Sequence, residues 1–279
     1  KDGVSKKPNE DTFSVIKTSD SILAAVLDGC SSQKPIASLK DQTGARFASH
    51  FLKRVFEETG GIELPVLNKK LLAESLQFEG ASLTDVHTLP ASTATIVQLA
   101  FGNRKLRISH VSDTFCIIQF TDNHTEFVTI DRNRKYDNEI FSLIKKIANE
   151  KQITPREARK DKRIIKAILD MYQDSYNKPD GTGQGIINGD PNVEKYIQDI
   201  SFPLDSIKAI IIGSDGLVPP GWDEQNEKDR EKMFSTVKSN GIKELIRIKK
   251  QIEDNDPNWQ IVRFKHSDDA TGIYIKLKE

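Results

Sequence analysis

The feature that most constrains the fold is a change of hydrophobic period near residue 93. From there to residue 130 the chain runs through four short segments rich in β-branched and aromatic residues, at 93–101, 106–112, 114–120 and 126–130. Turn-forming residues separate the first pair and the last pair of these segments, as is typical of hairpins. We therefore predict an antiparallel meander in the middle of the chain.

Helical patterns flank this region. Apolar residues recur at helical spacing from Thr43 until Gly60-Gly61, and leucines between Leu67 and Leu76 predict a second, shorter helix. Residues 139–176 and 224–253 are also predicted to be helical. Within the first of these, Thr154-Pro155-Arg156-Glu157 has the form of a capping box.

Further strands are predicted at 21–27, 207–213 and 272–277, and a glycine-rich loop at 178–192. Strands, then helices, then strands again favour an α+β sandwich over a doubly wound parallel sheet. No repeat or boundary divides the sequence, so we predict a single domain over residues 1–279.

Composition excludes several classes of protein. Lysine plus arginine and aspartate plus glutamate number 41 each, so the net charge is zero and favours neither nucleic acid nor an anionic membrane as a partner. No apolar run reaches the roughly 18 residues of a membrane span. Two cysteines, Cys30 and Cys116, are too few for a disulfide scaffold and fit a reducing compartment. We expect a cytoplasmic protein.

Acidic residues fall at the edges of the predicted strands. Asp28, Asp113, Asp215 and Asp268 each lie at such an edge, and Glu10-Asp11 directly precedes the apolar segment TFSVI. Carboxylates that converge at one rim of a sheet repel each other and need cations. An all-oxygen ligand set favours Mg²⁺ or Mn²⁺ over zinc. A single strand-end aspartate is often only a turn or cap residue, so the hypothesis of a metal site rests on the whole set.

Seven short motifs, taken together, resemble those of the PP2C-like (PPM) protein phosphatases, in the order in which that family has them. They are Lys7-Pro8-Asn9-Glu10-Asp11, Val26-Leu27-Asp28-Gly29, Ala91-Ser92-Thr93-Ala94, Val111-Ser112-Asp113-Thr114, Gly189-Asp190, Ser214-Asp215-Gly216 and Asp268-Asp269-Ala270-Thr271. Each motif is short and unspecific, but seven in order, from Gly3 to Leu277, are a specific signal.

The resemblance implies a four-layer αββα sandwich, with two antiparallel sheets flanked by helices and a two-metal centre at one end. By position, Asp28 would bridge both metals and the Gly29 carbonyl would bind one of them. Asp215 and Asp268 would hold the other metal, which makes these two residues and Asp28 the expected catalytic aspartates. Glu10 and Asp11 would support the centre directly or through water, and Asp113 matches the aspartate of a third, weaker site.

The resemblance also implies the chemistry. Two Mn²⁺ or Mg²⁺ ions would activate a bridging water, which attacks the phosphorus of phosphoserine or phosphothreonine in line. No covalent phospho-enzyme is needed, and neither cysteine is followed by the Cys-x₅-Arg pattern of a cysteine phosphatase. We interpret Cys30 and Cys116 as small packing residues.

Several positions depart from the family pattern. Lys6 stands where many members have an arginine that contacts the substrate phosphate, and lysine cannot make the bidentate fork of arginine. Cys30 replaces a histidine that many members have as a proposed proton donor, and Cys30-Ser31-Ser32 replaces the usual glycine-rich turn. In the fourth motif, Ser112 replaces a glycine. None of these changes removes a metal-binding carboxylate.

Three hypotheses about function follow. The first is an active, monomeric phosphatase whose partners are phosphorylated proteins and a cognate Ser/Thr kinase. The second is a catalytically weak or inactive member of the family that acts as a regulatory binding module. The third is an enzyme for small phosphorylated molecules. Metal-dependent hydrolysis of an aryl phosphate separates the second hypothesis from the other two.

Overall fold

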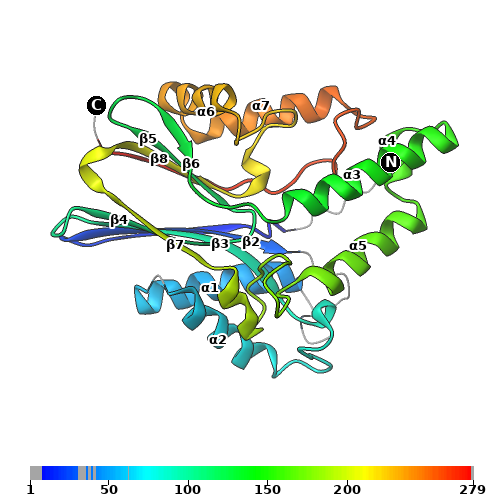
Figure 1. Cartoon of the computed structure of the whole chain (residues 1–279), viewed down its shortest axis with the longest axis horizontal. Coiled ribbons are helices and arrows are strands. Elements are labelled where there is room, and N and C mark those ends of the chain that lie inside the picture. Colours follow the sequence, from blue (N-terminus) through cyan, green and yellow to red (C-terminus); the bar gives the residue numbers. More distant parts are fainter. Residues whose placement is uncertain (1–7, 31–35, 37–38, 40–41, 62, 278–279) are drawn as a thin grey trace.

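The computed structural model describes residues 8–30, 36, 39, 42–61 and 63–277. Two antiparallel sheets form the centre of the molecule (Figure 1). The five-stranded sheet has the order β1 (Thr12–Lys17), β2 (Ser21–Cys30), β3 (Ala91–Ala100), β4 (Lys105–Val111) and β7 (Gln198–Pro203). The four-stranded sheet has the order β6 (Thr125–Phe127), β5 (Phe115–Phe120), β8 (Ile207–Gly213) and β9 (Gly272–Lys276).

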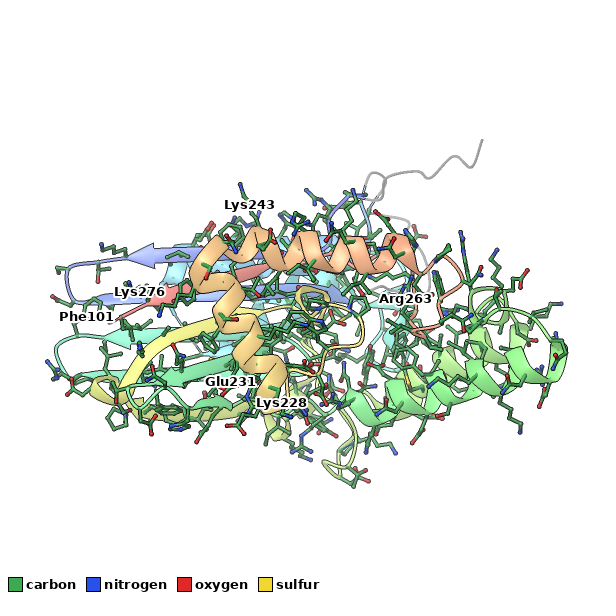
Figure 2. The ribbon with its side chains drawn as sticks, turned by 90° about the horizontal axis from the view of Figure 1, so that it is seen from above. Phe101, Lys228, Glu231, Lys243, Arg263 and Lys276 are labelled. Carbon is green, nitrogen blue, oxygen red and sulfur yellow. The ribbon has the colours of Figure 1, made fainter. Side chains whose placement is uncertain are left out.

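Helices cover the outer faces of both sheets. α1 (Gly44–Thr59) and α2 (Leu64–Ser75) lie on the five-stranded sheet, and α6 (Glu227–Asn240) and α7 (Ile242–Asn255) lie on the four-stranded sheet (Figure 1). From above, α6 with Lys228 and Glu231 and α7 with Lys243 cross over the strands (Figure 2). This arrangement confirms the predicted αββα sandwich.

A third group of helices lies at one end of the sandwich (Figure 1). It consists of α3 (Arg134–Lys151), α4 (Pro155–Ala158) and α5 (Lys162–Ser175), which pack through their own apolar cluster. The predicted capping box at Thr154 is confirmed, because the Thr154 and Glu157 side chains each bond the other residue's backbone N–H. Short 3₁₀ helices complete the structure at Val86–Thr88, Pro191–Lys195, Leu204–Ser206 and Asp215–Leu217.

The apolar run of β2 follows from its place between two layers. Leu23, Ala25 and Leu27 pack in the cluster that α1 and α2 cover, whereas Ala24 and Val26 pack between the sheets. Successive side chains of a strand point to opposite faces, so a strand that is buried on both faces is apolar at every position.

The predicted meander is wrong, because β4 and β5 do not pair. β4 pairs with β3 and β7, whereas β5 pairs with β6 and β8 in the other sheet. The chain changes sheets at Ser112, whose φ of 83° lies in the left-handed region. Strand propensity indicates where a strand forms but does not identify its partner.

The sequence reading missed β7 and merged several helices. β7 alternates between half-buried and exposed side chains at the edge of its sheet, so it lacks an apolar run. The helix predicted over 224–253 is two helices separated at Gly241, whose φ is 79°. The stretch 139–176 is likewise divided into α3, α4 and α5.

No helix within the described ranges is both long enough and apolar enough to cross a bilayer.

Candidate metal centre

Four of the predicted aspartates line one cavity of about 430 Å³: Asp28, Asp113, Asp215 and Asp268. Strand register explains how the second sheet contributes to it. Phe115 pairs with Gly213, and Gly213 pairs with Gly272. The residues just before β5, just after β8 and just before β9 therefore lie at the same edge of the sheet. β2 of the other sheet brings Asp28 to the same cavity.

Gly29 also lines this cavity, and its surroundings admit no side chain. A Cβ atom there would lie 2.5 Å from the carbonyl oxygen of Ala45 and 2.8 Å from that of Glu10. The backbone after Asp28 is thus pressed between the start of α1 and the N-terminal segment. The Ser92 hydroxyl donates a 2.7 Å hydrogen bond to the Asp28 carbonyl and fixes this segment from β3.

Glu10 lies behind the cavity and links three segments. Its Oε1 accepts a 2.5 Å hydrogen bond from the Thr43 hydroxyl, at the start of α1. Its backbone N–H donates to Asp269 Oδ2 at 2.7 Å, and its carbonyl accepts from the Ser49 hydroxyl. Glu10 is 5 % exposed, and these contacts brace the region around the aspartates.

Asp11 is equally buried, and the Ser214 hydroxyl donates to its Oδ2 at 2.6 Å. Its other oxygen, Oδ1, has no hydrogen-bond partner among the described residues. Asp113 has the same asymmetry: Asn133 donates to its Oδ2 at 2.6 Å, while its Oδ1 is buried without a partner in the described part of the chain. Each of these two carboxylates therefore has one oxygen that accepts a hydrogen bond and one oxygen without a hydrogen-bond partner among the described residues.

The negative charges of the site repel one another. Burial, followed by the charges of Asp11 and Asp215, raises the pKa of Asp28 well above its usual range. Burial and the charges of Asp268 and Asp113 raise the pKa of Asp215 to about 8. Burial also raises the pKa of Asp11 to about 7 and that of Asp113 to about 6. Bound cations would offset both the burial and the repulsion.

The ligand atoms available in the cavity are of the type that hard divalent cations prefer. They are carboxylate oxygens, of which Asp113 Oδ1 is buried and lacks a partner within the described residues, and oxygen ligands suit Mg²⁺ and Mn²⁺. Within those residues, no three His, Cys, Asp or Glu side chains converge on one point as they stand. Mg²⁺ usually keeps several waters and uses one or two carboxylates, so such convergence is not required of this site.

The cavity also contains residues that the sequence reading did not select. Asp137 of α3 lies in it, and burial together with Asp113 raises its pKa well above the usual range. Arg159 and Lys265 are cations in the wall, and Asn133 holds Asp113. None of these residues follows an apolar strand, which was the signal that identified the other aspartates.

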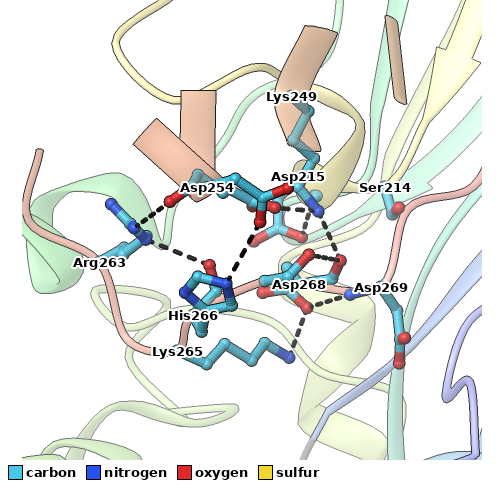
Figure 3. A network of polar contacts seen from close by, with 12 residues as sticks. Ser214, Asp215, Lys249, Asp254, Arg263, Lys265, His266, Asp268 and Asp269 are labelled. Atoms are coloured by element: carbon cyan, nitrogen blue, oxygen red, sulfur yellow. Dashed lines mark hydrogen bonds and ion pairs between the residues drawn. The ribbon is translucent and has the colours of Figure 1, made fainter. Parts of the chain in front are cut away.

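Lys265 is directed at the site (Figure 3). Its ammonium group forms an ion pair with Asp268 Oδ1, and its side chain is 47 % exposed. Partial desolvation lowers the pKa of Lys265 less than the charges of Asp268 and Asp215 raise it. Lys249 of α7 donates to the Asp268 carbonyl at 2.5 Å. One lysine therefore contacts the side chain of Asp268 and another contacts its backbone.

The two cysteines differ. Cys116 is fully buried between the sheets, as predicted for a packing residue. Cys30 instead lines the cavity, where burial and the charges of Asp113 and Asp28 raise its pKa well above the usual range. A thiol with a raised pKa is a poor nucleophile.

Lys6, the predicted phosphate contact, lies outside the described residues.

Solved structures share this fold at low sequence identity. A bacterial serine phosphatase, in a variant with one arginine replaced by alanine, is 14 % identical, with a TM-score of 0.51, over 99 % of this chain and 94 % of that one. RsbX, crystallised in complex with magnesium, is also 14 % identical, with a TM-score of 0.50, over 97 % of this chain and 88 % of that one. The sequence matched no curated protein.

The family of the chain is shown by a comparison of its sequence with a family model. The model described as protein phosphatase 2C matches residues 3–247, which is most of the chain. Its match includes the segments that carry Asp28, Asp113 and Asp215. The chain therefore belongs to the protein phosphatase 2C family.

Proposed function

We propose that this chain hydrolyses phosphoserine and phosphothreonine on protein substrates, with two Mg²⁺ or Mn²⁺ ions as cofactors. The observation that carries the proposal is the convergence of four aspartates, from separate segments of both sheets, on one cavity. Family membership supports the same reaction. A set of neighbouring carboxylates that raise one another's pKa lowers stability unless it binds cations, so we attribute its presence to function.

Asp28, Asp215, Asp268 and the Gly29 carbonyl are the groups that we propose hold the metal pair, with a weaker third site at Asp113. When bound, the two ions would lower the pKa of a water molecule and neutralise the phosphoryl oxygens. The protein's own part is to fix the ligands. Ser92 restrains the backbone of Asp28, and Lys249 restrains that of Asp268.

Glu10 and Asp11 take a supporting role in this proposal. They do not line the cavity, but Thr43 and Ser214 hold their carboxylates beside it. Lys265 compensates part of the negative charge through its ion pair with Asp268. Cys30 keeps its proton and forms no covalent intermediate. We propose Lys6 as the residue that captures the substrate phosphate.

A phosphopeptide assay tests the function. The purified chain, stripped with EDTA and then supplied with Mn²⁺ or Mg²⁺, should release phosphate from a phosphothreonine peptide, and iodoacetamide should have little effect. Release of phosphate from small phosphorylated molecules but from no phosphopeptide would favour the third hypothesis. Phosphopeptide binding without hydrolysis in any metal would favour the inactive binding module and contradict the proposal.

A further inference from the structure

The two described cations of the cavity differ in their partners. Lys265 is paired with Asp268. Arg159 forms no ion pair with any described carboxylate, and among the described residues Tyr172 is the one ionisable neighbour that shifts its pKa. A cavity with several carboxylates thus contains a guanidinium group that none of them neutralises.

The position of Arg159 is well fixed. It directly follows α4, which the Thr154 capping box begins, and its backbone N–H donates to the Pro155 carbonyl at 2.9 Å. The preceding residue, Ala158, is fully buried. The Arg159 guanidinium lies 5.9 Å from the centre of the Phe264 ring. The side chain is therefore part of the wall rather than a free surface group.

One nitrogen of the Arg159 guanidinium also lacks a hydrogen-bond partner. Its Nε is buried and has no hydrogen-bond partner in the described part of the chain. Burial lowers the pKa of the guanidinium, which means that its charge is disfavoured where it stands. A half-desolvated charge and a buried unsatisfied N–H both reduce stability. An anion that enters the cavity and binds the guanidinium would offset both penalties.

The place of Arg159 in the wall indicates which anion that is. Phe264 and, from α5, Ile168, Met171 and Tyr172 form the more apolar part of the lining. The Arg159 guanidinium lies over the Phe264 ring, on this apolar part of the lining, and forms no ion pair with any of the described aspartates, where the reacting phosphate is proposed to bind. The anion at Arg159 is therefore a second group of the substrate, beside the phosphorylated residue. Arginine's planar fork suits a carboxylate.

We infer that Arg159 binds a carboxylate side chain that flanks the phosphorylated residue, so that the enzyme selects acidic phosphopeptides. The inference rests on the proposed function, because it assigns the substrate class of the same cavity. Arg159 acts here in substrate selection and takes no part in the reaction itself.

Paired phosphopeptides test the inference. In one set, glutamate replaces glutamine at each of the three positions on either side of the phosphothreonine. For the wild-type protein with Mn²⁺ we expect glutamate at one or more positions to raise kcat/KM about tenfold. Arg159→Gln should reduce this ratio to about one, and Arg159→Lys should keep part of it because the charge remains.

A matched control comes from the same short helix. Arg156 is exposed, and its side chain donates only to the Pro257 carbonyl among the described hydrogen-bond partners, so Arg156→Gln removes the same charge. It should leave the glutamate preference unchanged. If wild type shows no preference at any position, if Arg159→Gln retains it, or if Arg156→Gln loses it equally, the inference is overturned.

A binding measurement separates this inference from the proposed function. The same peptides, labelled with a fluorophore and titrated in EDTA so that no turnover occurs, report affinity alone. A glutamate preference in affinity that depends on Arg159 supports the inference even if no peptide is hydrolysed. Hydrolysis of all peptides, with no preference in either assay, rejects the inference and leaves the proposed function standing.

Discussion

The Ser214 hydroxyl donates a 2.6 Å hydrogen bond to Oδ2 of Asp11, although 203 positions separate the two residues. Ser214 follows β8 of one sheet and Asp11 precedes β1 of the other, so the bond links the two sheets beside the cavity. The same oxygen of Ser214 accepts from the Thr271 N–H at 3.0 Å. The N-terminal acidic motif and the two C-terminal ones are thereby held together by one hydroxyl group.

Ser214→Ala should reduce both stability and metal response. The substitution leaves Asp11 Oδ2 and the Thr271 N–H without this partner, at a cost of about 1–3 kcal/mol in the free energy of unfolding. Urea denaturation with EDTA present measures the loss, and Mn²⁺ titration of activity should show a higher half-saturating concentration. Ser235→Ala, which removes an exposed hydroxyl bonded to Lys232, is the control and should change neither. An unchanged unfolding midpoint in Ser214→Ala would contradict this role.

The buried pair Lys249–Glu253 allows stability and metal affinity to be separated. The two side chains are 5 % and 3 % exposed, and Nζ lies 3.5 Å from Oε1. Lys249→Met leaves a buried carboxylate uncompensated and should lower the free energy of unfolding by about 3–5 kcal/mol. Lys249→Met with Glu253→Leu should recover most of that loss.

Neither variant can donate to the Asp268 carbonyl. We therefore expect both to bind Mn²⁺ more weakly than wild type, as measured by calorimetric titration. A double variant with wild-type affinity would show that Lys249 stabilises the fold without positioning Asp268.

Ser112 should be strained where the family has glycine. Its φ is 83°, and its hydroxyl donates to Asn133, which in turn donates to Asp113. Ser112→Ala loses the hydroxyl and keeps the left-handed backbone, whereas Ser112→Gly loses the hydroxyl and relieves the strain. Since a left-handed conformation costs a residue with a Cβ about 1–2 kcal/mol, we expect the glycine variant to be the more stable of the two in thermal melts. The reverse order would contradict the strain.

His110 should make stability depend on pH. Burial lowers its pKa to about 4 in the folded protein, while its usual value is 6.5. Between these values the unfolded chain binds a proton that the folded chain does not, so this contribution is complete above about pH 6.5 and is lost as the pH falls toward 4. The slope is about 1.4 kcal/mol per pH unit.

The comparison with His110→Gln isolates this residue, because the carboxylates that also titrate are common to both proteins. Urea melts in EDTA at several pH values should show a difference in unfolding free energy, wild type minus variant, that falls as the pH is lowered from 6.5 to 4. A difference independent of pH would mean that His110 is not buried in its neutral form.

The pattern of apolar runs predicted an α+β sandwich and the members of the aspartate cluster for the same reason, whereas the four layers were implied by the family resemblance. Apolar runs mark buried strands, and an aspartate directly after such a run lies at the edge of a sheet, as Asp28 and Asp215 do. Asp137 and Arg159 could not be found in this way, because they reach the cavity only through the packing of α3, α4 and α5. The pairing of β5 with β8 could not be predicted either, since the choice of a partner strand depends on contacts between residues that are distant in sequence. The roles of the aspartates, and the single domain over 1–279, stay predictions.

The central claim is that Asp28 and its neighbours hold a catalytic metal pair, and Asp28→Asn tests it most directly. Asp28 is the one carboxylate assigned to both ions, so the loss of its charge should weaken both and raise the pKa of the attacking water. The measurement is Mn²⁺-dependent hydrolysis of a phosphothreonine peptide, with a thermal melt of each protein alongside. We predict that Asp28→Asn retains a cooperative melt and loses its activity. Activity within about threefold of wild type, a factor worth less than about 1 kcal/mol in the barrier, would contradict the two-metal assignment.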